Sequence, residues 1–278
     1  MPGLVLEGGT LRAIFSAGAM DALLDQGIEF PYCVGVSAGI ANGLSYVSRQ
    51  KERNLEVLMK YRLDGRYVGR RNYIKYRSLF GIDFIFSEIP NRLVPFDWTT
   101  FFGYQGTVLA VATNAATGEA EYLDCSEMDR ACTILRATCA LPLLFPVVDW
   151  KGRKYFDGGL ADSVPVAKAM RDGNEKNLII LTQPAGFQKE YEKSYDLVIR
   201  FLGKQYPKLV DVLKTRHLRY NEELALCERL EAEGKAVVLR PSYTLDNMEK
   251  DLDQIRANYQ HGYDTAMTVM PQIRALFD

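Results

Sequence analysis

One serine in this chain has neighbours that suit nucleophilic chemistry. Residues 35–39 read Gly-Val-Ser-Ala-Gly, between an apolar run that starts at Phe30 and a segment of helical character that reaches Ser48. A strand that turns sharply into a helix exposes the residue at the corner, and small neighbours are needed because the chain doubles back there. The unpaired N–H groups at the start of such a helix favour negative charge. Ser37 is therefore a candidate nucleophile, although the pattern also fits a plain turn whose serine caps a helix.

A carboxylate further along the chain is the candidate base. A serine hydroxyl needs a group that accepts its proton, and Asp157 is followed by two glycines that let its carboxylate protrude from a tight turn. The only histidines, His217 and His261, lie in charged C-terminal segments. An α/β-hydrolase triad would also require several strands before the serine, and here one precedes it. We therefore expect a Ser–Asp dyad; the alternative for Asp-Gly-Gly is a hairpin turn.

A third motif provides candidate donors for an oxyanion. Gly8 and Gly9 follow the first apolar run, Leu4–Leu6. Without a Cβ, their backbone can approach a ligand closely and direct N–H groups toward it. Such a turn can bind either a developing oxyanion or a nucleotide phosphate. The dinucleotide fingerprint requires Gly-x-Gly-x-x-Gly, which this turn lacks, so the oxyanion interpretation is favoured.

The elements around these motifs predict an α/β protein. Leu4–Leu6 reads as a strand, Ala13–Gln26 as a helix and Phe30–Val36 as a second strand, which together make a βαβ unit with parallel strands. Ser37 then lies at the carboxyl end of a parallel strand, where open α/β sheets bind their ligands. Further segments are read as helices at 41–62, 128–139 and 166–171 and as strands at 107–113, 119–123, 147–150, 154–156 and 178–182.

The composition changes near Gln188. Beyond it, long charged helices are expected at 209–233 and 250–277, with one short strand at 236–239. We therefore expect two parts, a catalytic domain at 1–188 and a mainly helical extension at 189–278.

Composition limits the other functional classes. A net charge of −1 gives no reason to expect nucleic-acid binding. Five cysteines without C-x-x-C spacing argue against a disulfide framework and a zinc site, and reduced thiols suit a cytoplasmic protein. We see no signal peptide, and the longest apolar stretch, 139–148, is too short to span a bilayer, so any membrane contact is expected from the surface. The sequence is silent on the oligomeric state.

The three motifs together resemble the patatin-like phospholipases. The resemblance rests on Gly-Gly-Thr-Leu-Arg at 8–12, Gly-Val-Ser-Ala-Gly at 35–39 and Asp-Gly-Gly at 157–159, and it covers about residues 3–185. Residues 140–146 are similar to the family's proline-containing segment before the aspartate. The C-terminal part resembles the extension of a bacterial subgroup.

The resemblance implies a three-layer α/β/α fold with a mainly parallel central sheet. It implies Ser37 as nucleophile, Asp157 as proton acceptor, and acyl esters of phospholipids or lysophospholipids as substrates, with no metal or organic cofactor. The resemblance assigns the oxyanion hole to Gly8, Gly9, Thr10, Arg12 and Ala38. It identifies the motif glycines as Gly35, Gly39, Gly158 and Gly159. The alternatives are an esterase or thioesterase for small soluble esters, and a catalytically weak protein that binds acyl lipids or a partner.

This sequence departs from the family pattern in the glycine turn. The family usually has Gly-Gly-Gly-x-Arg/Lys-Gly, and here Thr10 and Ala13 replace two of the glycines. A Cβ at Thr10 is tolerable only if that residue does not need a positive φ. Oxyanion stabilisation is therefore the step that the departures affect, and loss of one donor typically costs ~10²–10³ in rate.

Two further stretches each have two interpretations. The aromatic stretch 79–104 either lines an acyl-chain pocket or lid, or packs into the core. The basic, tyrosine-rich run 66–77 either meets anionic lipid headgroups or is a solvated face.

Overall fold

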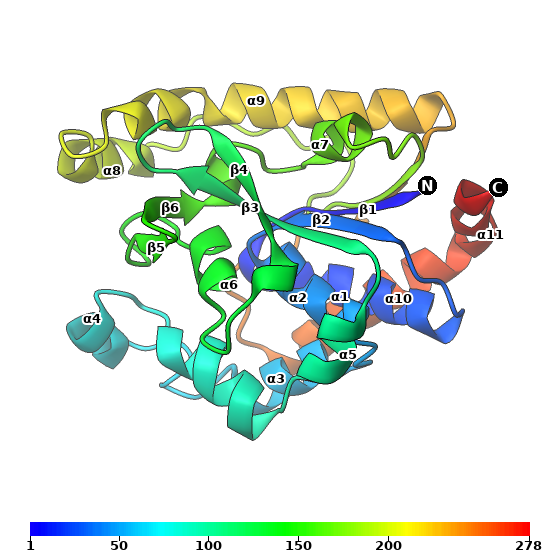
Figure 1. Ribbon diagram of the computed structural model, residues 1–278, viewed down its shortest axis with the longest axis horizontal. Coiled ribbons are helices and arrows are strands. Elements are labelled where there is room, and N and C mark those ends of the chain that lie inside the picture. The colour runs from blue at the N-terminus through cyan, green and yellow to red at the C-terminus, as the bar shows by residue number, and fades with distance from the viewer.

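The apolar runs pair into one sheet of eight strands around which the chain is built (Figure 1). The computed structural model describes the backbone of residues 1–278 and all side chains except those of Lys75 and Tyr76. The sheet order is β5-β6-β3-β2-β1-β7-β8, and β4 pairs with β3. Five of the strands run parallel to one another, namely β1, β2, β3, β7 and β8. Antiparallel pairs are formed by β4 with β3, β6 with β3, and β5 with β6. The strands are β1 Gly3–Leu6, β2 Tyr32–Val36, β3 Thr107–Asn114, β4 Ala120–Asp124, β5 Val148–Trp150, β6 Arg153–Asp157, β7 Asn177–Ile180 and β8 Ala236–Leu239.

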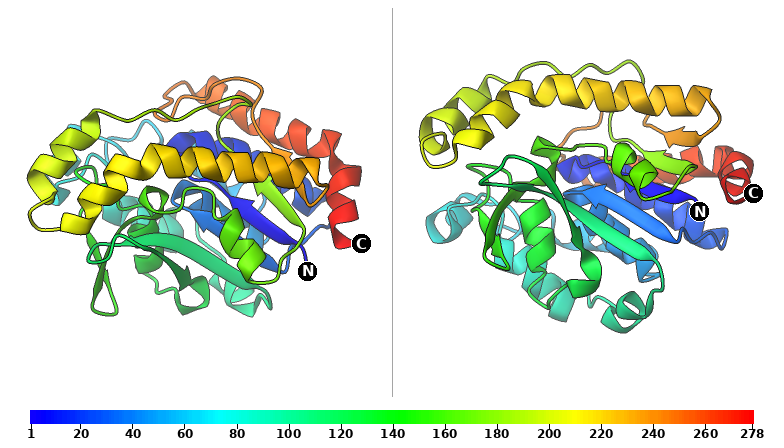
Figure 2. Two further views of the ribbon diagram at one scale, coloured as in Figure 1. Left: turned by 90° about the horizontal axis from the view of Figure 1, so that it is seen from above. Right: turned by 45° about the horizontal axis from the view of Figure 1, so that its top comes forward.

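Helices cover both faces of this sheet, so the expected three-layer α/β/α fold is confirmed (Figures 1 and 2). The alternation of side chains along β1 divides the core: Leu4 and Leu6 pack with α1 and α2, whereas Val5 packs with α7 and α9. The helices are α1 Ile14–Asp25, α2 Ala38–Val47, α3 Arg53–Tyr61, α4 Arg70–Tyr76, α5 Trp98–Gly103, α6 Thr133–Thr138, α7 Val166–Arg171, α8 Ser194–Leu202, α9 Pro207–Ala232, α10 Leu252–Thr268 and α11 Met270–Arg274. To these are added a π-helix, η2 Phe84–Leu93, and the short 3₁₀ turns η1 Thr10–Ala13, η3 Cys125–Glu127, η4 Gly158–Leu160 and η5 Ala275–Phe277.

The register of β3 brings two distant chain segments together. β2 pairs with β3 as far as Val36 opposite Val111, and β6 pairs with the next residue of β3, Ala112, through Asp157. β4 pairs with the same part of β3. Because β4 occupies one edge there, β2 and β6 must follow one another along the other edge. The end of β2 therefore meets the end of β6, where Ser37 and Asp157 lie.

The C-terminal region is continuous with the rest of the fold. β8 pairs parallel with β7 in the same sheet, and α9 crosses one face of the sheet along its full width (Figure 2). On the other face, the Tyr259 hydroxyl of α10 donates a hydrogen bond to the buried carboxylate of Asp21 in α1, at 2.7 Å. The elements after residue 189 thus cover both faces.

The expected helix at 41–62 is divided in the structure. α2 ends at Val47 and α3 begins at Arg53, and both Arg49 and Glu52 have positive φ, 57° and 60°. The Glu52 amide donates to the carboxylate of Asp21, 2.7 Å away. This long-range bond holds the chain out of helical geometry, and the local pattern could not reveal it.

The aromatic stretch packs mainly into the core. Its buried members are Phe80, Phe84, Phe86, Phe96, Trp98 and Phe101. Phe102 is exposed. The core interpretation therefore holds for most of these side chains.

Candidate active site

Ser37 lies at the sharp turn between β2 and α2. Its backbone has φ 52° and ψ −129°, a conformation that L-residues rarely adopt. The turn is held by the Ser37 N–H, which donates to the Thr138 hydroxyl at 2.8 Å. Gly39 is required here because a Cβ at this position would lie 2.3 Å from the carbonyl oxygen of Glu7. The expected strand–turn–helix geometry around Ser37 is therefore present.

Asp157 ends β6 and is buried, with 3% of its surface exposed. Its Oδ1 accepts a hydrogen bond from the Gly159 N–H at 2.8 Å, whereas its buried Oδ2 has no hydrogen-bond partner in the described part of the chain. Burial raises the pKa of Asp157 to about 6, and the Gly159 N–H, the nearby Ser37 hydroxyl and Arg216 oppose this rise. Ser37 and Asp157 are thus neighbours, although no hydrogen bond of ordinary geometry joins them. Such contacts are often long without substrate.

The glycine turn lies against Ser37. A Cβ at Gly8 would be 3.2 Å from the Cβ of Ser37, which is closer than most real Cβ contacts, so glycine favours this approach. In the described part of the chain, no backbone acceptor takes a hydrogen bond from the N–H groups of Gly8, Gly9, Thr10 or Ala38. These amides are therefore available to a ligand beside Ser37.

Thr10 has a positive φ, a backbone conformation that is unfavourable for a residue with a Cβ. Its φ is 53°, in the left-handed region that favours glycine. A non-glycine residue held there costs about 1–3 kcal/mol. The strain of this turn is therefore carried by Thr10.

Arg12 supports the turn from the side. Its Nε donates to the Thr182 hydroxyl at 3.5 Å, and that hydroxyl donates to the carbonyl oxygen of Gly8 at 2.9 Å. Beneath the turn, the buried carboxylate of Glu7 accepts hydrogen bonds from the Thr182 N–H at 2.5 Å and the Tyr220 hydroxyl at 2.7 Å. The loop is therefore fixed both to the segment just after β7 and to α9.

Two cavities meet at Ser37. The large cavity, about 640 Å³, contains the glycine turn and Asp157 together with charged residues. The small cavity, about 170 Å³, extends under α2 and α3. Thr10, Ser37 and Leu141 line both. Most of the small cavity's wall is apolar and includes Ile14, Val57, Leu58, Phe80, Phe86 and Phe145.

Sequence reasoning missed the contribution of α9 to this site. Arg216 donates through Nε to the carbonyl oxygen of Gly159 at 2.5 Å, and it lines the large cavity with Lys189, Glu192 and Tyr220. Arg216 and Tyr220 are four residues apart and so share one helix face. That spacing was the available signal, but it does not say which face meets the sheet.

The histidines lie elsewhere. Neither His217 nor His261 lines either cavity at Ser37. His261 accepts the Ser242 N–H at 3.0 Å and stacks on Tyr243, and His217 packs edge-on against Tyr191.

Comparison with known proteins identifies the fold's relatives. The family model for patatin-like phospholipase matches residues 4–170. The chain belongs to this family. Residues 206–278 match a second model, a domain of unknown function, DUF6363. Ser37 and Asp157 lie in the first match and Arg216 in the second.

Two individual proteins are similar to this chain. An uncharacterized protein of Escherichia coli strain K12, YjjU, is 26% identical over 196 residues, which cover 66% of this chain and 52% of YjjU. The chain thus spans about half the length of that relative. The crystal structure of VipD from Legionella pneumophila covers 97% of this chain and 66% of VipD, with a TM-score of 0.51 and 14% identity, and at this identity the likeness shows the fold.

The described residues contain no helix with both the length and the apolar character needed to cross a bilayer. They also contain no group of three or more His, Cys, Asp or Glu side chains arranged to hold a metal ion.

Proposed function

We propose that this patatin-like protein is a lipid acyl hydrolase that cleaves phospholipid or lysophospholipid acyl esters with a Ser37–Asp157 dyad. The observation that carries the proposal is the position of Ser37. It stands at a strained corner, beside a buried carboxylate and beside amides that have no backbone acceptor in the described part of the chain, and at the junction of two cavities. A nucleophile needs these neighbours to attack an ester.

The small cavity favours a lipid over a small soluble ester. Its wall is largely aliphatic and aromatic, so it gains most from burying a hydrocarbon chain. A short polar acyl group would leave this surface unfilled. Acyl chains of lipids are thus the substrates that the cavity fits best.

The positions of these groups support the following reaction. Asp157 accepts the proton of Ser37 as the serine oxygen attacks the ester carbonyl, and the oxyanion is held by N–H groups of Gly8, Gly9 and Ala38. Asp157 then protonates the leaving alcohol, and water hydrolyses the acyl-enzyme. The raised pKa of Asp157 suits this role, because a carboxylate with a pKa of about 6 is a stronger base than an exposed aspartate.

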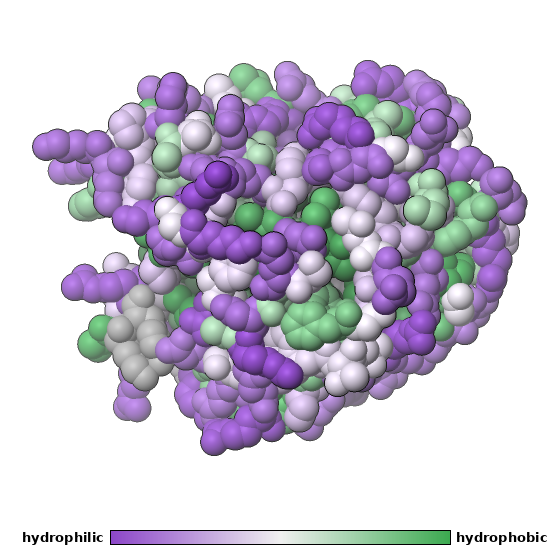
Figure 3. All heavy atoms as spheres, viewed as in Figure 1, coloured by the Kyte–Doolittle hydropathy of each residue, from purple (hydrophilic) through white to green (hydrophobic). Residues whose placement is uncertain are grey.

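Exposed apolar side chains around the large cavity suit contact with a lipid surface. Leu144 and Leu197 line this cavity and are 40% and 51% exposed, and Phe201, one turn further along α8, is 64% exposed. Most of the face seen in Figure 3 is hydrophilic by contrast. We propose that the protein meets its substrate in a membrane or micelle through this rim.

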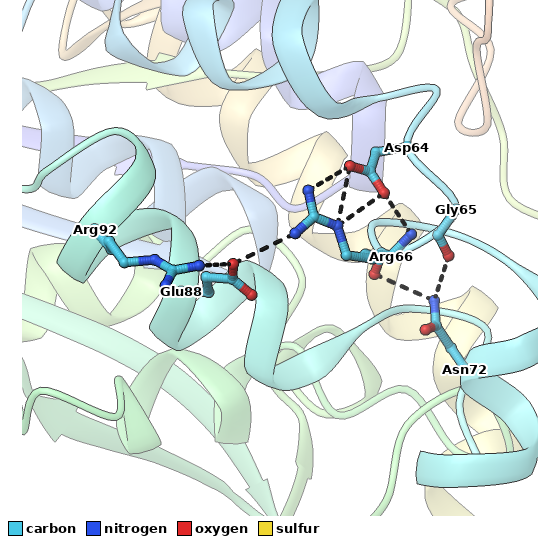
Figure 4. A network of polar contacts seen from close by, with 6 residues as sticks. All are labelled: Asp64, Gly65, Arg66, Asn72, Glu88 and Arg92. Carbon is cyan, nitrogen blue, oxygen red and sulfur yellow. Dashed lines mark hydrogen bonds and ion pairs between the residues drawn. The ribbon is translucent and has the colours of Figure 1, made fainter.

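The first residue of the basic run 66–77 contributes little to contact with a lipid surface. Arg66 is already paired with Asp64 at 2.7 Å and with Glu88 at 3.4 Å, and Glu88 also binds Arg92 (Figure 4). Arg70, Arg71 and Arg77 are exposed. The side chains of Lys75 and Tyr76, which the sequence also places in this run, lie outside the described residues.

A fluorophosphonate probe and a lipid panel test the proposal. We expect the probe to label wild-type protein and not Ser37→Ala, and we expect Ser37→Ala and Asp157→Asn to abolish fatty-acid release from phospholipid vesicles. His217→Ala and His261→Ala should keep most of the activity. If the folded protein is neither labelled by the probe nor able to hydrolyse esters, it would instead be a lipid- or partner-binding module. If a folded histidine variant has lost its activity, a catalytic triad would have to be assigned in place of the dyad.

A further inference from the structure

Three cationic side chains converge on the large cavity. Arg12 comes from the glycine turn, Lys189 from the segment after β7, and Arg216 from α9. The side chains of Lys189 and Arg216 are only 16% and 17% exposed. Cations held this far from water are retained where they are paired or where they bind an anion.

Protein carboxylates pair with only part of this charge. Glu192 is the partner of both Lys189, at 2.5 Å, and Arg216, at 3.5 Å. Arg12 donates only to the neutral Thr182 hydroxyl among its hydrogen-bond partners in the described part of the chain. The pKa of Lys189 is lowered by burial first and then by the positive charges of Arg216 and Arg12, which act against its own attraction to Glu192. The three cations therefore repel one another, and this repulsion is offset in part by the carboxylates of Glu7 and Asp157, which line the same cavity and attract Arg12 and Arg216 respectively.

The chemistry at Ser37 sets which part of a substrate enters this cavity. Asp157, which would protonate the leaving alcohol, lines the large cavity and not the small one. The acyl chain fits the small, apolar cavity. The alcohol part of the ester must therefore extend into the large cavity, toward the three cations.

We propose that the large cavity binds the phosphate group of a glycerophospholipid headgroup, held by Lys189, Arg216 and Arg12. This inference rests on the proposed function, and it names the alcohol portion of the substrate. A phosphate is the anion that a glycerolipid carries a few bonds from its acyl ester. Arginine and lysine provide the charge-assisted donors that phosphate prefers. Two of the three donors lie beyond residue 188, so the C-terminal region takes part in selecting the substrate.

Binding can be measured without catalysis. Full-length Ser37→Ala protein is titrated by calorimetry with glycerol 3-phosphate, glycerol and inorganic phosphate at constant ionic strength. We expect glycerol 3-phosphate to bind and glycerol not to bind. Adding Lys189→Met should weaken binding about tenfold or more, because a hydrogen bond to a charged group is lost. Lys214→Met, which removes an exposed lysine from α9, is the matched control and should change nothing.

The second part of the test measures the rate of ester hydrolysis. In wild-type protein we expect kcat/KM to be higher for a lysophosphatidic acid than for the monoacylglycerol with the same chain, and Lys189→Met should lower that ratio about tenfold. Equal ratios in wild-type, Lys189→Met and Lys214→Met proteins would overturn the inference. So would tight binding of inorganic phosphate without binding of glycerol 3-phosphate, which would indicate free phosphate. If no ester is hydrolysed but the calorimetric pattern holds, the proposed function fails and the phosphate site stands.

Discussion

The guanidinium of Arg216 donates a hydrogen bond through Nε to the carbonyl oxygen of Gly159, and the two atoms lie 2.5 Å apart. Gly159 is also the residue whose N–H binds the carboxylate of Asp157. One residue of the Asp-Gly-Gly turn therefore connects α9 to the proposed base. The region matched by the domain of unknown function thus contacts the proposed catalytic machinery directly.

Removing this contact should loosen the turn that carries Asp157. We expect Arg216→Met to lower kcat on a neutral monoacyl ester and to lower the free energy of unfolding by about 1.5–3 kcal/mol, since a largely buried, charged hydrogen bond is lost. Arg229→Met, at an exposed site on the same helix, is the control for the loss of charge. Steady-state kinetics and chemical denaturation measure the two effects. Unchanged kcat in Arg216→Met would mean that the turn holds Asp157 without α9.

The pH dependence of hydrolysis should report the ionisation of Asp157. Because burial raises its pKa to about 6, the carboxylate that accepts the proton is lost as the pH falls below about 6. We expect kcat/KM on a soluble ester to fall about tenfold for each pH unit below that value. The rate of fluorophosphonate labelling should follow the same curve. An activity that stays constant down to pH 5 would exclude Asp157 as the base.

The same pKa predicts a cost in stability. A carboxyl group whose pKa is raised on folding, here from 3.8 to about 6, binds its proton more tightly in the folded state. It therefore destabilises the fold above pH 6, by on the order of 3 kcal/mol, and this cost disappears as the pH falls toward 4. We expect Asp157→Asn to raise Tm at pH 7.5 and to give a smaller gain at pH 4.5. Equal gains at both pH values would contradict the assignment.

Thr10 offers a test of strain in the glycine turn. Thr10→Gly removes the Cβ from a residue with φ 53°, so we expect hydrolysis to be kept or increased and the free energy of unfolding to rise by up to about 1 kcal/mol after the entropy cost of glycine. Thr10→Ala removes the hydroxyl but keeps the Cβ, and it is the matched control. If both variants behave alike, the side chain rather than the backbone conformation matters at this position.

The local sequence predicted those parts of the site whose backbone geometry restricts the residue type. The glycines around Ser37 and after Asp157 could be recognised in this way, because few residue types fit a sharp turn at the end of a strand. The βαβ order then predicted the parallel sheet and the end of it at which Ser37 lies.

The remaining features depend on contacts between distant segments. The break between α2 and α3 follows from the bond between Glu52 and Asp21, which lie 31 positions apart. The role of Arg216 depends on which face of α9 meets the sheet, and a helical pattern gives the faces but not their partners. The sequence shows that Thr10 replaces a glycine of the family pattern, but only the structure shows that its φ is positive.

The shared edge of β3 has a consequence for divergence within the family. The distance between positions 37 and 157 is fixed by backbone pairing of consecutive residues, Val111 and Ala112, and not by the path of the 119 residues between them. Insertions or deletions in the connecting loops should leave the two groups together, so these loops are free to vary and to change which lipids are accepted. A residue inserted between Val111 and Ala112, inside β3 itself, would separate the pair, so this short stretch does not share that freedom.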